Sequence, residues 1–131
     1  MIETEINVRW GEMDAFGHVN NVEYFRYMEV GRIEYFGLPS IKSYMTTEKA
    51  EGIGPILKKI NCIYHVPVNY PSQLVVKTSV TSIGNTSLKI EQKICGRKSN
   101  NLVAEGESIV VLFDYSNHCL LYTSPSPRDR G

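Results

Sequence analysis

GEMDAFGHVNN (residues 11–21) decides how this sequence is organised, because the periodicity of the chain differs on its two sides. Before it, Ile6, Val8 and Trp10 alternate with polar residues, which is the pattern of a half-buried strand over residues 3–10. After it, the pattern becomes helical. The segment is therefore a strand-to-helix connection, and it carries many more polar and turn-forming side chains than a connection needs.

Residues 21–37 have the periodicity of a helix that buries one face. Side chains suited to that face recur at steps of three and four residues: Val22, Phe25, Met28, Arg32, Ile33 and Phe36. Asn20 or Asn21 can cap the start, and Gly37 before Leu38-Pro39 is a typical stop. Gly31 costs about 1 kcal/mol of helix propensity relative to alanine, so we expect a close packing contact there.

The remainder of the chain, from Pro55 onward, is patterned as β-strands. Four strands are expected, at about 56–66, 73–83, 86–97 and 102–115. Short turn-rich segments between them imply antiparallel neighbours, and residues 40–53 are read as a short helix or loop. The order predicts an α+β domain in which a five-stranded antiparallel sheet wraps around one long helix. The open edges of such a sheet invite pairing with a second copy.

The composition is that of one ordinary globular domain, with 131 residues, 42% of them hydrophobic. Lys+Arg and Asp+Glu balance at 14 each, so no global charge favours nucleic acid or an anionic membrane. No apolar run approaches the roughly 18 residues of a membrane span, and the first residues, MIETEINVRW, lack the features of a signal peptide. We therefore expect a cytoplasmic protein.

Neither a metal nor a cofactor is expected. The three cysteines (Cys62, Cys95 and Cys119) and the histidines have no metal-ligand spacing, and Cys62 and Cys95 are read as free thiols within strands. The motifs of P-loop, Rossmann, serine-hydrolase and zinc-peptidase sites do not occur in the sequence.

The last thirteen residues, CLLYTSPSPRDRG (119–131), differ in character from the rest of the chain. They resemble the in-frame translation of a sequencing-library adapter. We therefore expect residues 1–118 to form the domain and residues 119–131 to be a non-native tail; the alternative is a natural disordered tail.

The patterned segments resemble the hot-dog fold, in particular acyl-CoA thioesterases of the 4-hydroxybenzoyl-CoA thioesterase-like family. The most specific piece is VRWGEMDAFGHVNNVEYFRYMEVGRIEYF (residues 8–36), which contains D-x-x-G-H-V-N-N-x-x-Y at Asp14 to Tyr24. YHVPVNYPSQLVV and AEGESIVVLFDY support it, and the resemblance covers about residues 3–115. It implies that Asp14 is the catalytic carboxylate, that the backbone N–H of Asn21 binds the oxyanion, and that the working unit is a homodimer or homotetramer with interfacial active sites.

The chemistry of a thioester fits this location. Hydrolysis needs a nucleophile beside an electrophilic carbonyl and positive potential where the oxyanion develops, and a helix N-terminus supplies that potential. Asp14 would attack directly to form a mixed anhydride or would activate water, and the sequence leaves both routes open. From the residues alone, Asp14 is equally an Asx-turn residue that orders the loop. Glu12, the rival carboxylate, is expected to be solvated.

The other residues of the connection have expected roles around this centre. His18 holds the loop by hydrogen bonds, with protonation of the leaving thiolate as the alternative. Asn20 caps the helix and organises the loop, and Gly17 supplies backbone freedom near the thioester or simply a turn. Tyr24 packs near the substrate or braces the loop. Four basic side chains are candidates for the phosphates of coenzyme A, although each can be merely solvated: Lys58, Lys59, Arg97 and Lys98.

The sequence thus predicts a metal-independent acyl-CoA thioesterase. One alternative is a thioesterase acting on acyl-carrier protein, which would favour a basic docking patch that is not evident. Another is a non-catalytic module that binds acyl thioesters in the same groove. A dehydratase of this fold would need a His-centred motif, which the sequence lacks.

Overall fold

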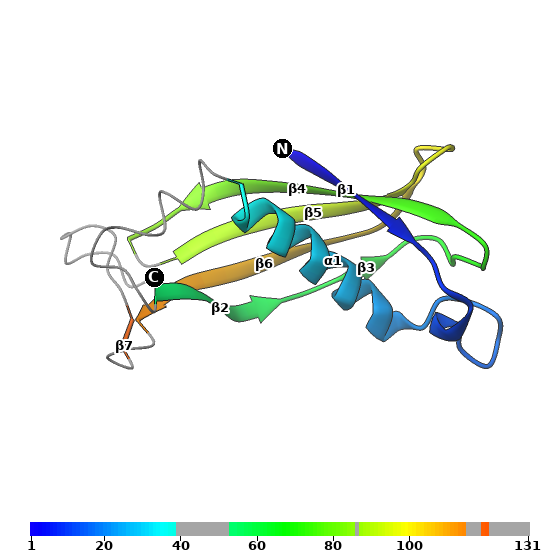
Figure 1. The fold of residues 1–131 in the computed structure, drawn as a ribbon, viewed down its shortest axis with the longest axis horizontal. Helices are drawn as coiled ribbons and strands as arrows, with labels where there is room; N and C mark the ends of the chain where they lie inside the picture. The colour runs from blue at the N-terminus through cyan, green and yellow to red at the C-terminus, as the bar shows by residue number, and fades with distance from the viewer. Residues whose placement is uncertain (39–52, 86, 115–118, 121–131) are drawn as a thin grey trace.

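One long helix lies across one face of an antiparallel sheet in the computed structural model of this chain (Figure 1). The structure describes residues 1–38, 53–85, 87–114 and 119–120. The elements are β1 (Ile2–Asn7), the 3-10 turn η1 (Trp10–Glu12), α1 (Asn21–Phe36), β2 (Ile53–Ile60), β3 (Ile63–Tyr64), β4 (Gln73–Ile83), β5 (Ser87–Gly96), β6 (Leu102–Asp114) and β7 (Cys119–Leu120). Every pair of neighbouring strands is antiparallel.

The predicted α+β class and the five-stranded path are confirmed. The strands lie in the order β1-β4-β5-β6-β2, and the short strands β3 and β7 pair with β6. The strand expected at 56–66 is divided into β2 and β3 at Asn61 and Cys62. The N–H of Asn61 still donates to the carbonyl of Glu107 at 3.0 Å, but the side-chain Oδ1 of Asn61 accepts the N–H of Glu107 at 3.0 Å, which interrupts the regular main-chain pairing. Of the loop or helix expected at 40–53, residues 40–52 lie outside the described part of the chain.

Two residues of the expected tail, Cys119–Leu120, form β7, and residues 121–131 lie outside the described part of the chain. Cys62 and Cys95 are free thiols, but only Cys95 lies within a strand. Across the described residues, no helix is long and apolar enough to cross a membrane.

The first strand is shorter than its alternating pattern predicts. Ile6 and Val8 are buried as expected, but Trp10 is 76% exposed. The prediction for Trp10 is wrong because the chain leaves the sheet after Asn7 and enters η1, where the alternation of side chains ends.

The helix begins and ends as predicted, and Met28 and Arg32 of the predicted stripe are buried, but the rest of the buried face differs from the prediction. The buried residues of α1 are Tyr24, Tyr27, Met28, Gly31 and Arg32. Two residues of the predicted apolar stripe, Val22 and Ile33, are 54% and 65% exposed, so that part of the prediction is wrong. Tyrosine is not part of the predicted stripe, yet it buries a ring as large as that of phenylalanine when its hydroxyl has a hydrogen-bond partner.

Small residues let the helix approach the sheet. A Cβ atom added to Gly31 would lie 2.8 Å from Thr78 Oγ1 and 2.9 Å from Gln92 Nε2, which confirms the predicted close contact. On β6, a Cβ at Gly106 would lie 3.0 Å from Met28 Sδ and would overlap the carbonyl oxygen of Asn61. These glycines therefore set the spacing between α1 and the strands beneath it.

Buried polar groups also connect the helix to the sheet. Gln92 Nε2 donates to the carbonyl of Met28 at 2.8 Å and to Thr78 Oγ1 at 3.0 Å, while Arg32 donates to Gln92 Oε1 at 3.3 Å. Burial lowers the pKa of Arg32, an effect that the nearby charge of Glu29 opposes. The middle of α1 is thus fixed to β4 and β5, and its N-terminal end projects toward the η1 loop (Figure 1).

Candidate active site

The connection between β1 and α1 is a small, internally bonded loop. The N–H of Asn20 donates to the carbonyl of Glu12 at 2.9 Å, and the N–H of Asp14 donates to the carbonyl of His18 at 2.6 Å. Between these two links, Met13 and Val19 form a β-bridge. The N–H of Val19 also donates to Val68 O at 2.7 Å, which fastens the loop to the segment before β4. The main chain alone therefore gives the loop a defined shape.

Asp14 directs one carboxylate oxygen back into this loop. Its Oδ1 accepts the N–H of Phe16 at 2.8 Å and the N–H of His18 at 3.1 Å. These bonds, from His18 first and then Phe16, hold the pKa of Asp14 below its ordinary value because they favour the charged form. The structure therefore contains the Asx-type turn. Both bonds use Oδ1, so Oδ2 takes no part in the turn.

Gly17 occupies the tip of the loop with a φ of +80°. A Cβ there would meet no atom within 4 Å, so space does not require a glycine, whereas the left-handed backbone does. The N–H of Gly17 donates to the carbonyl of Asp14 at 3.2 Å, and this bond closes the turn.

The N-terminus of α1 is capped as predicted by Asn20. Its side-chain Oδ1 accepts the N–H of Val22 at 3.2 Å, and its carbonyl accepts the N–H of Glu23 at 2.9 Å. The first N–H groups of a helix have no partner within it. Within the described residues, the hydrogen bonds around the cap leave the Asn21 N–H unused. The carbonyl of Asn21 accepts the hydroxyl of Tyr64 on β3 at 3.0 Å, which ties this turn of the helix to the sheet.

The prediction that Glu12 is solvated is wrong. Its Oε1 accepts the N–H of Arg9 at 2.8 Å and the hydroxyl of Tyr27 at 2.7 Å. Tyr27 is only 3% exposed, and burial together with the hydrogen bond to Glu12 raises its pKa, so its hydroxyl remains a donor at neutral pH.

Two open hollows adjoin at this end of the molecule. The first, about 630 Å³, is lined by Asp14 and Gly17 together with Trp10, Met13 and Tyr70. The second, about 730 Å³, is lined by Arg97 and Lys98 in the β5–β6 turn and by residues 67–74, among which Tyr70 also lines the first. Both volumes lie within the range of small-molecule sites. The carboxylate and two basic residues therefore surround neighbouring hollows.

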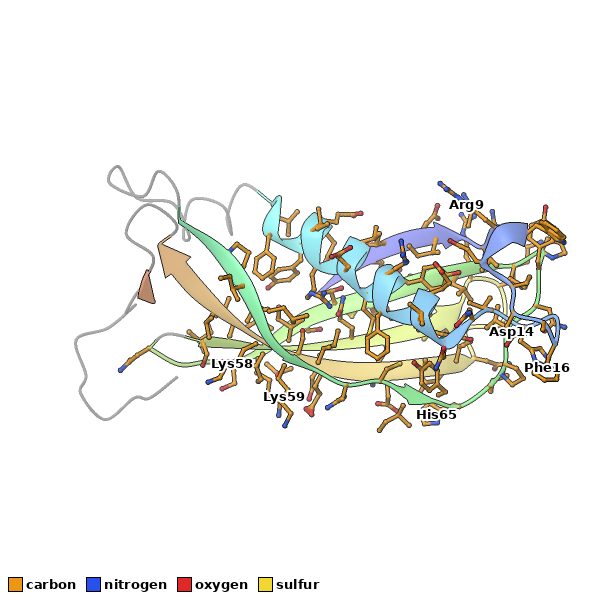
Figure 2. All side chains as sticks on the ribbon, turned by 90° about the horizontal axis from the view of Figure 1, so that it is seen from below. Arg9, Asp14, Phe16, Lys58, Lys59 and His65 are labelled. Carbon is orange, nitrogen blue, oxygen red and sulfur yellow. The ribbon has the colours of Figure 1, made fainter. Side chains whose placement is uncertain are left out.

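The four basic candidates are not gathered in one place. Arg97 forms an ion pair with Glu5 at 2.9 Å and donates to Gln73 Oε1 at 3.3 Å, which orients its guanidinium beside the second hollow. Lys58 and Lys59 lie along β2, away from the end of the molecule that carries Asp14 and Phe16 (Figure 2). This chain by itself does not bring Lys58 and Lys59 to the site.

The remaining predicted residues support the loop. His18 joins Asp14 through its backbone N–H and C=O, and its ring is partly exposed. Tyr24 is 4% exposed and packs edge-on against Tyr64, with ring centroids 5.0 Å apart. Burial raises the pKa of Tyr24, and a hydrogen bond from the backbone of Val68 opposes that effect. Its contacts are those of a side chain that braces the loop from below. In the described part of the chain, no cluster of three His, Cys, Asp or Glu side chains offers a metal site.

Sequence reasoning missed the pair formed by Glu12 and Tyr27, and also Trp10 and Tyr70 as lining residues. No local pattern indicates the Glu12–Tyr27 bond, because the two residues are fifteen positions apart and in different elements. Tyr70 had a detectable signal, since it is an aromatic residue in the turn-rich segment PVNYPS, where exposed rings often serve binding.

Known proteins resemble the chain in sequence and in fold. The sequence profile of the thioesterase-like superfamily matches residues 8–128. A relative from Arabidopsis thaliana, the chloroplastic acyl-acyl carrier protein thioesterase ATL2, is 28% identical over 112 residues, which are 86% of this chain and 58% of the relative. The chain thus spans little more than half the length of that protein.

Solved structures agree with this assignment. The PA2801 protein of Pseudomonas aeruginosa, a proposed thioesterase, has a TM-score of 0.79 at 28% identity and covers 95% of this chain and 91% of its own. A proposed acyl-CoA thioesterase from Xanthomonas campestris has a TM-score of 0.70 at 29% identity, covering 84% and 90% of the two chains. The fold, the profile match and these likenesses agree, and the chain therefore belongs to the thioesterase-like superfamily and has the hot-dog fold.

Proposed function

We propose that this chain hydrolyses acyl-CoA thioesters with Asp14 as the catalytic carboxylate and the Asn21 N–H as the oxyanion donor. The observation that carries the proposal is the state of Asp14, which lines an open hollow while only its Oδ1 is held by the loop. The same bonded loop leads directly into the N-terminus of α1, whose Asn21 N–H is unused within the described residues.

Hydrolysis adds one water across the acyl C–S bond and releases the carboxylic acid and the thiol. The bonds to Oδ1 keep Asp14 ionised at neutral pH and fix its orientation, so that Oδ2 is the oxygen available to the substrate or to water. Attack by Oδ2 on the carbonyl and activation of water by Oδ2 both develop negative charge on the carbonyl oxygen. A helix N-terminus stabilises that charge through its N–H groups and dipole.

The second hollow suits the other end of the substrate. Coenzyme A carries phosphates, and Arg97 and Lys98 line a hollow that meets the Asp14 hollow at Tyr70. A thioester lying across Tyr70 would place its carbonyl beside Asp14 and its phosphates beside Arg97. Charge-assisted hydrogen bonds from arginine to phosphate are strong, and they need no change in the loop.

We further propose that the working unit is a homodimer or a dimer of dimers. Leu57 on β2, Ile63 on β3 and Val66 just after β3 are exposed at 44%, 57% and 48% along this edge of the sheet. An apolar edge of this kind is a surface that a second copy can cover. In such an assembly Lys58 and Lys59 of one copy would have a route to the site of another, which they do not have within one chain.

A second candidate substrate is an acyl-carrier-protein thioester, because the Arabidopsis relative is named for that activity. The reaction at the carbonyl would be the same, and the carrier protein would dock where coenzyme A otherwise binds. Comparing turnover of one acyl group on coenzyme A and on carrier protein distinguishes the two substrates.

The decisive experiment measures thiol release from a panel of acyl-CoAs by the native chain and by Asp14→Asn. Asparagine keeps an oxygen for the N–H groups of Phe16 and His18, so the loop should survive while the charge is lost. We expect kcat to fall by about 10²–10⁴-fold with substrate binding retained. Glu91→Gln, which removes an exposed carboxylate from the sheet, is the matched control. Near-native turnover by Asp14→Asn would remove Asp14 from the mechanism, and binding without turnover by the native chain would favour the binding module.

A further inference from the structure

We infer that Glu12 is a positioning residue that, together with Tyr27, sets the orientation of the α1 N-terminus relative to the Asp14 loop. The inference deepens the proposed function and rests on it. Glu12 takes no part in the reaction itself, and Tyr27 lies within the core. The inference rests on the observation that Glu12 is bonded to α1 at two points.

Glu12 holds α1 at two points. Its backbone carbonyl accepts the N–H of Asn20, the cap residue, at 2.9 Å, and its side-chain Oε1 accepts the hydroxyl of Tyr27 at 2.7 Å. Tyr27 lies six residues after the first residue of the helix, which is about 9 Å along its axis. The middle of α1 is fixed to β4 and β5. One attachment would therefore leave the η1 loop free to pivot about the helix, whereas two attachments separated along the helix axis fix the orientation of the loop relative to it.

The same carboxylate oxygen also fixes the loop. Oε1 also accepts the N–H of Arg9 at 2.8 Å, so the η1 turn holds the Glu12 side chain in the position from which it bonds to Tyr27. Asp14 follows two residues later and is held by its own bonds to Phe16 and His18. Glu12 is therefore bonded both to the loop that carries Asp14 and to the helix, so it fixes the position of one relative to the other.

This attachment bears on catalysis more than on the integrity of the loop. The loop retains its main-chain links between Glu12 and Asn20 and between Asp14 and His18 when the Glu12 side chain is removed. Removal of the side chain abolishes the second attachment. The orientation of the oxyanion donor relative to the Asp14 loop is then no longer fixed. Donor placement matters in the transition state, whereas binding of the distant part of the substrate does not depend on it.

The test compares four variants in steady-state kinetics, each assayed well below its unfolding midpoint: Glu12→Ala, Glu12→Gln, Tyr27→Phe and the double variant Glu12→Ala/Tyr27→Phe. Glu12→Ala should lower kcat by about 10–100-fold with KM within about threefold of native, because a displacement of about 1 Å can cost that much in rate. Glu12→Gln keeps an acceptor oxygen and should restore kcat to within about threefold of native.

The pair should also behave as one unit. Tyr27→Phe should lower kcat about as much as Glu12→Ala, and the double variant should be no slower than either single variant, because each single change already breaks the same bond. Tyr35→Phe removes the hydroxyl of another helix tyrosine and serves as the matched control, with kcat expected to be unchanged.

Some results would overturn the inference. Glu12→Ala with native kcat and a lowered unfolding midpoint would make the residue purely structural. Glu12→Gln as slow as Glu12→Ala would assign the effect to charge instead of position. An unimpaired Asp14→Asn, or no turnover by the native chain, would instead refute the proposed function. Amide exchange gives a readout independent of activity: Glu12→Ala should speed exchange at Arg9, whose N–H donates to Glu12 Oε1, at least about tenfold, while exchange at Asn20, whose main-chain link is retained, should change little. Unchanged exchange at Arg9 would refute the attachment.

Discussion

Replacing Gly31 with alanine tests the packing that holds α1 above the sheet, and with it the position of the Asp14 loop. On helix propensity alone, Gly31→Ala should stabilise the protein by about 1 kcal/mol. The structure predicts the opposite, since the new Cβ would lie 2.8 Å from Thr78 Oγ1, 2.9 Å from Gln92 Nε2 and 2.9 Å from Val76 Cγ1. Real Cβ atoms do not occur so close to three different atoms, so the helix or the strands must move.

The cost can be estimated from what would have to move. Overpacking a core by one methyl costs about 1–3 kcal/mol. Displacing Gln92 also weakens its bonds to Met28 O and Thr78 Oγ1, and a buried amide left without a partner costs about 1–3 kcal/mol. After the propensity gain is subtracted, we expect Gly31→Ala to lower the free energy of unfolding by about 2 kcal/mol. With an unfolding entropy of about 2.1 cal/mol/K per residue, this lowers the melting temperature by about 7 °C.

Urea denaturation followed by circular dichroism measures this free energy directly. Gly11→Ala is the matched control, because a Cβ at Gly11 meets nothing within 4 Å and its effect should stay within about 0.5 kcal/mol. A Gly31→Ala protein as stable as the native chain, or more stable, would refute the reasoning, since it would mean that the helix lies farther from the sheet.

Two further predictions concern the site. Arg97→Ala should raise KM for an acyl-CoA by about tenfold with little change in kcat, because the proposed function places Arg97 beside the phosphates and far from the carbonyl; the same acyl group on a small thiol without phosphates should show no difference. The folded-state pKa of Asp14 lies below its ordinary value of 3.8, so the ionised group stabilises the fold above about pH 4, and that contribution is lost as the pH falls through the folded pKa. The difference in unfolding free energy between the native chain and Asp14→Asn should therefore be constant near neutrality and shrink below about pH 4; a difference that grows toward acid would contradict the sign of the shift.

Local patterns in the sequence were enough for the elements and their order. The strand predicted at 73–83 has those bounds in the structure, α1 begins after Asn20 and ends before Gly37, and Gly31 makes the close contact expected of it. These features depend on residues near one another in the chain: alternation of side chains, a capping side chain and a helix interruption. Asp14 is indicated by the resemblance to a family whose motif is contiguous, and its catalytic role stays a prediction.

What only the tertiary structure decided depends on residues far apart in the sequence. Periodicity shows that a helix has a buried face, but neighbouring elements select that face, and here they select Tyr24 and Tyr27 over Val22 and Ile33. The attachment of Glu12 to Tyr27 and the meeting of two hollows at Tyr70 arise in the same way. A hydrogen bond between distant residues leaves no periodic trace, because its geometry exists only once the helix has packed on the sheet.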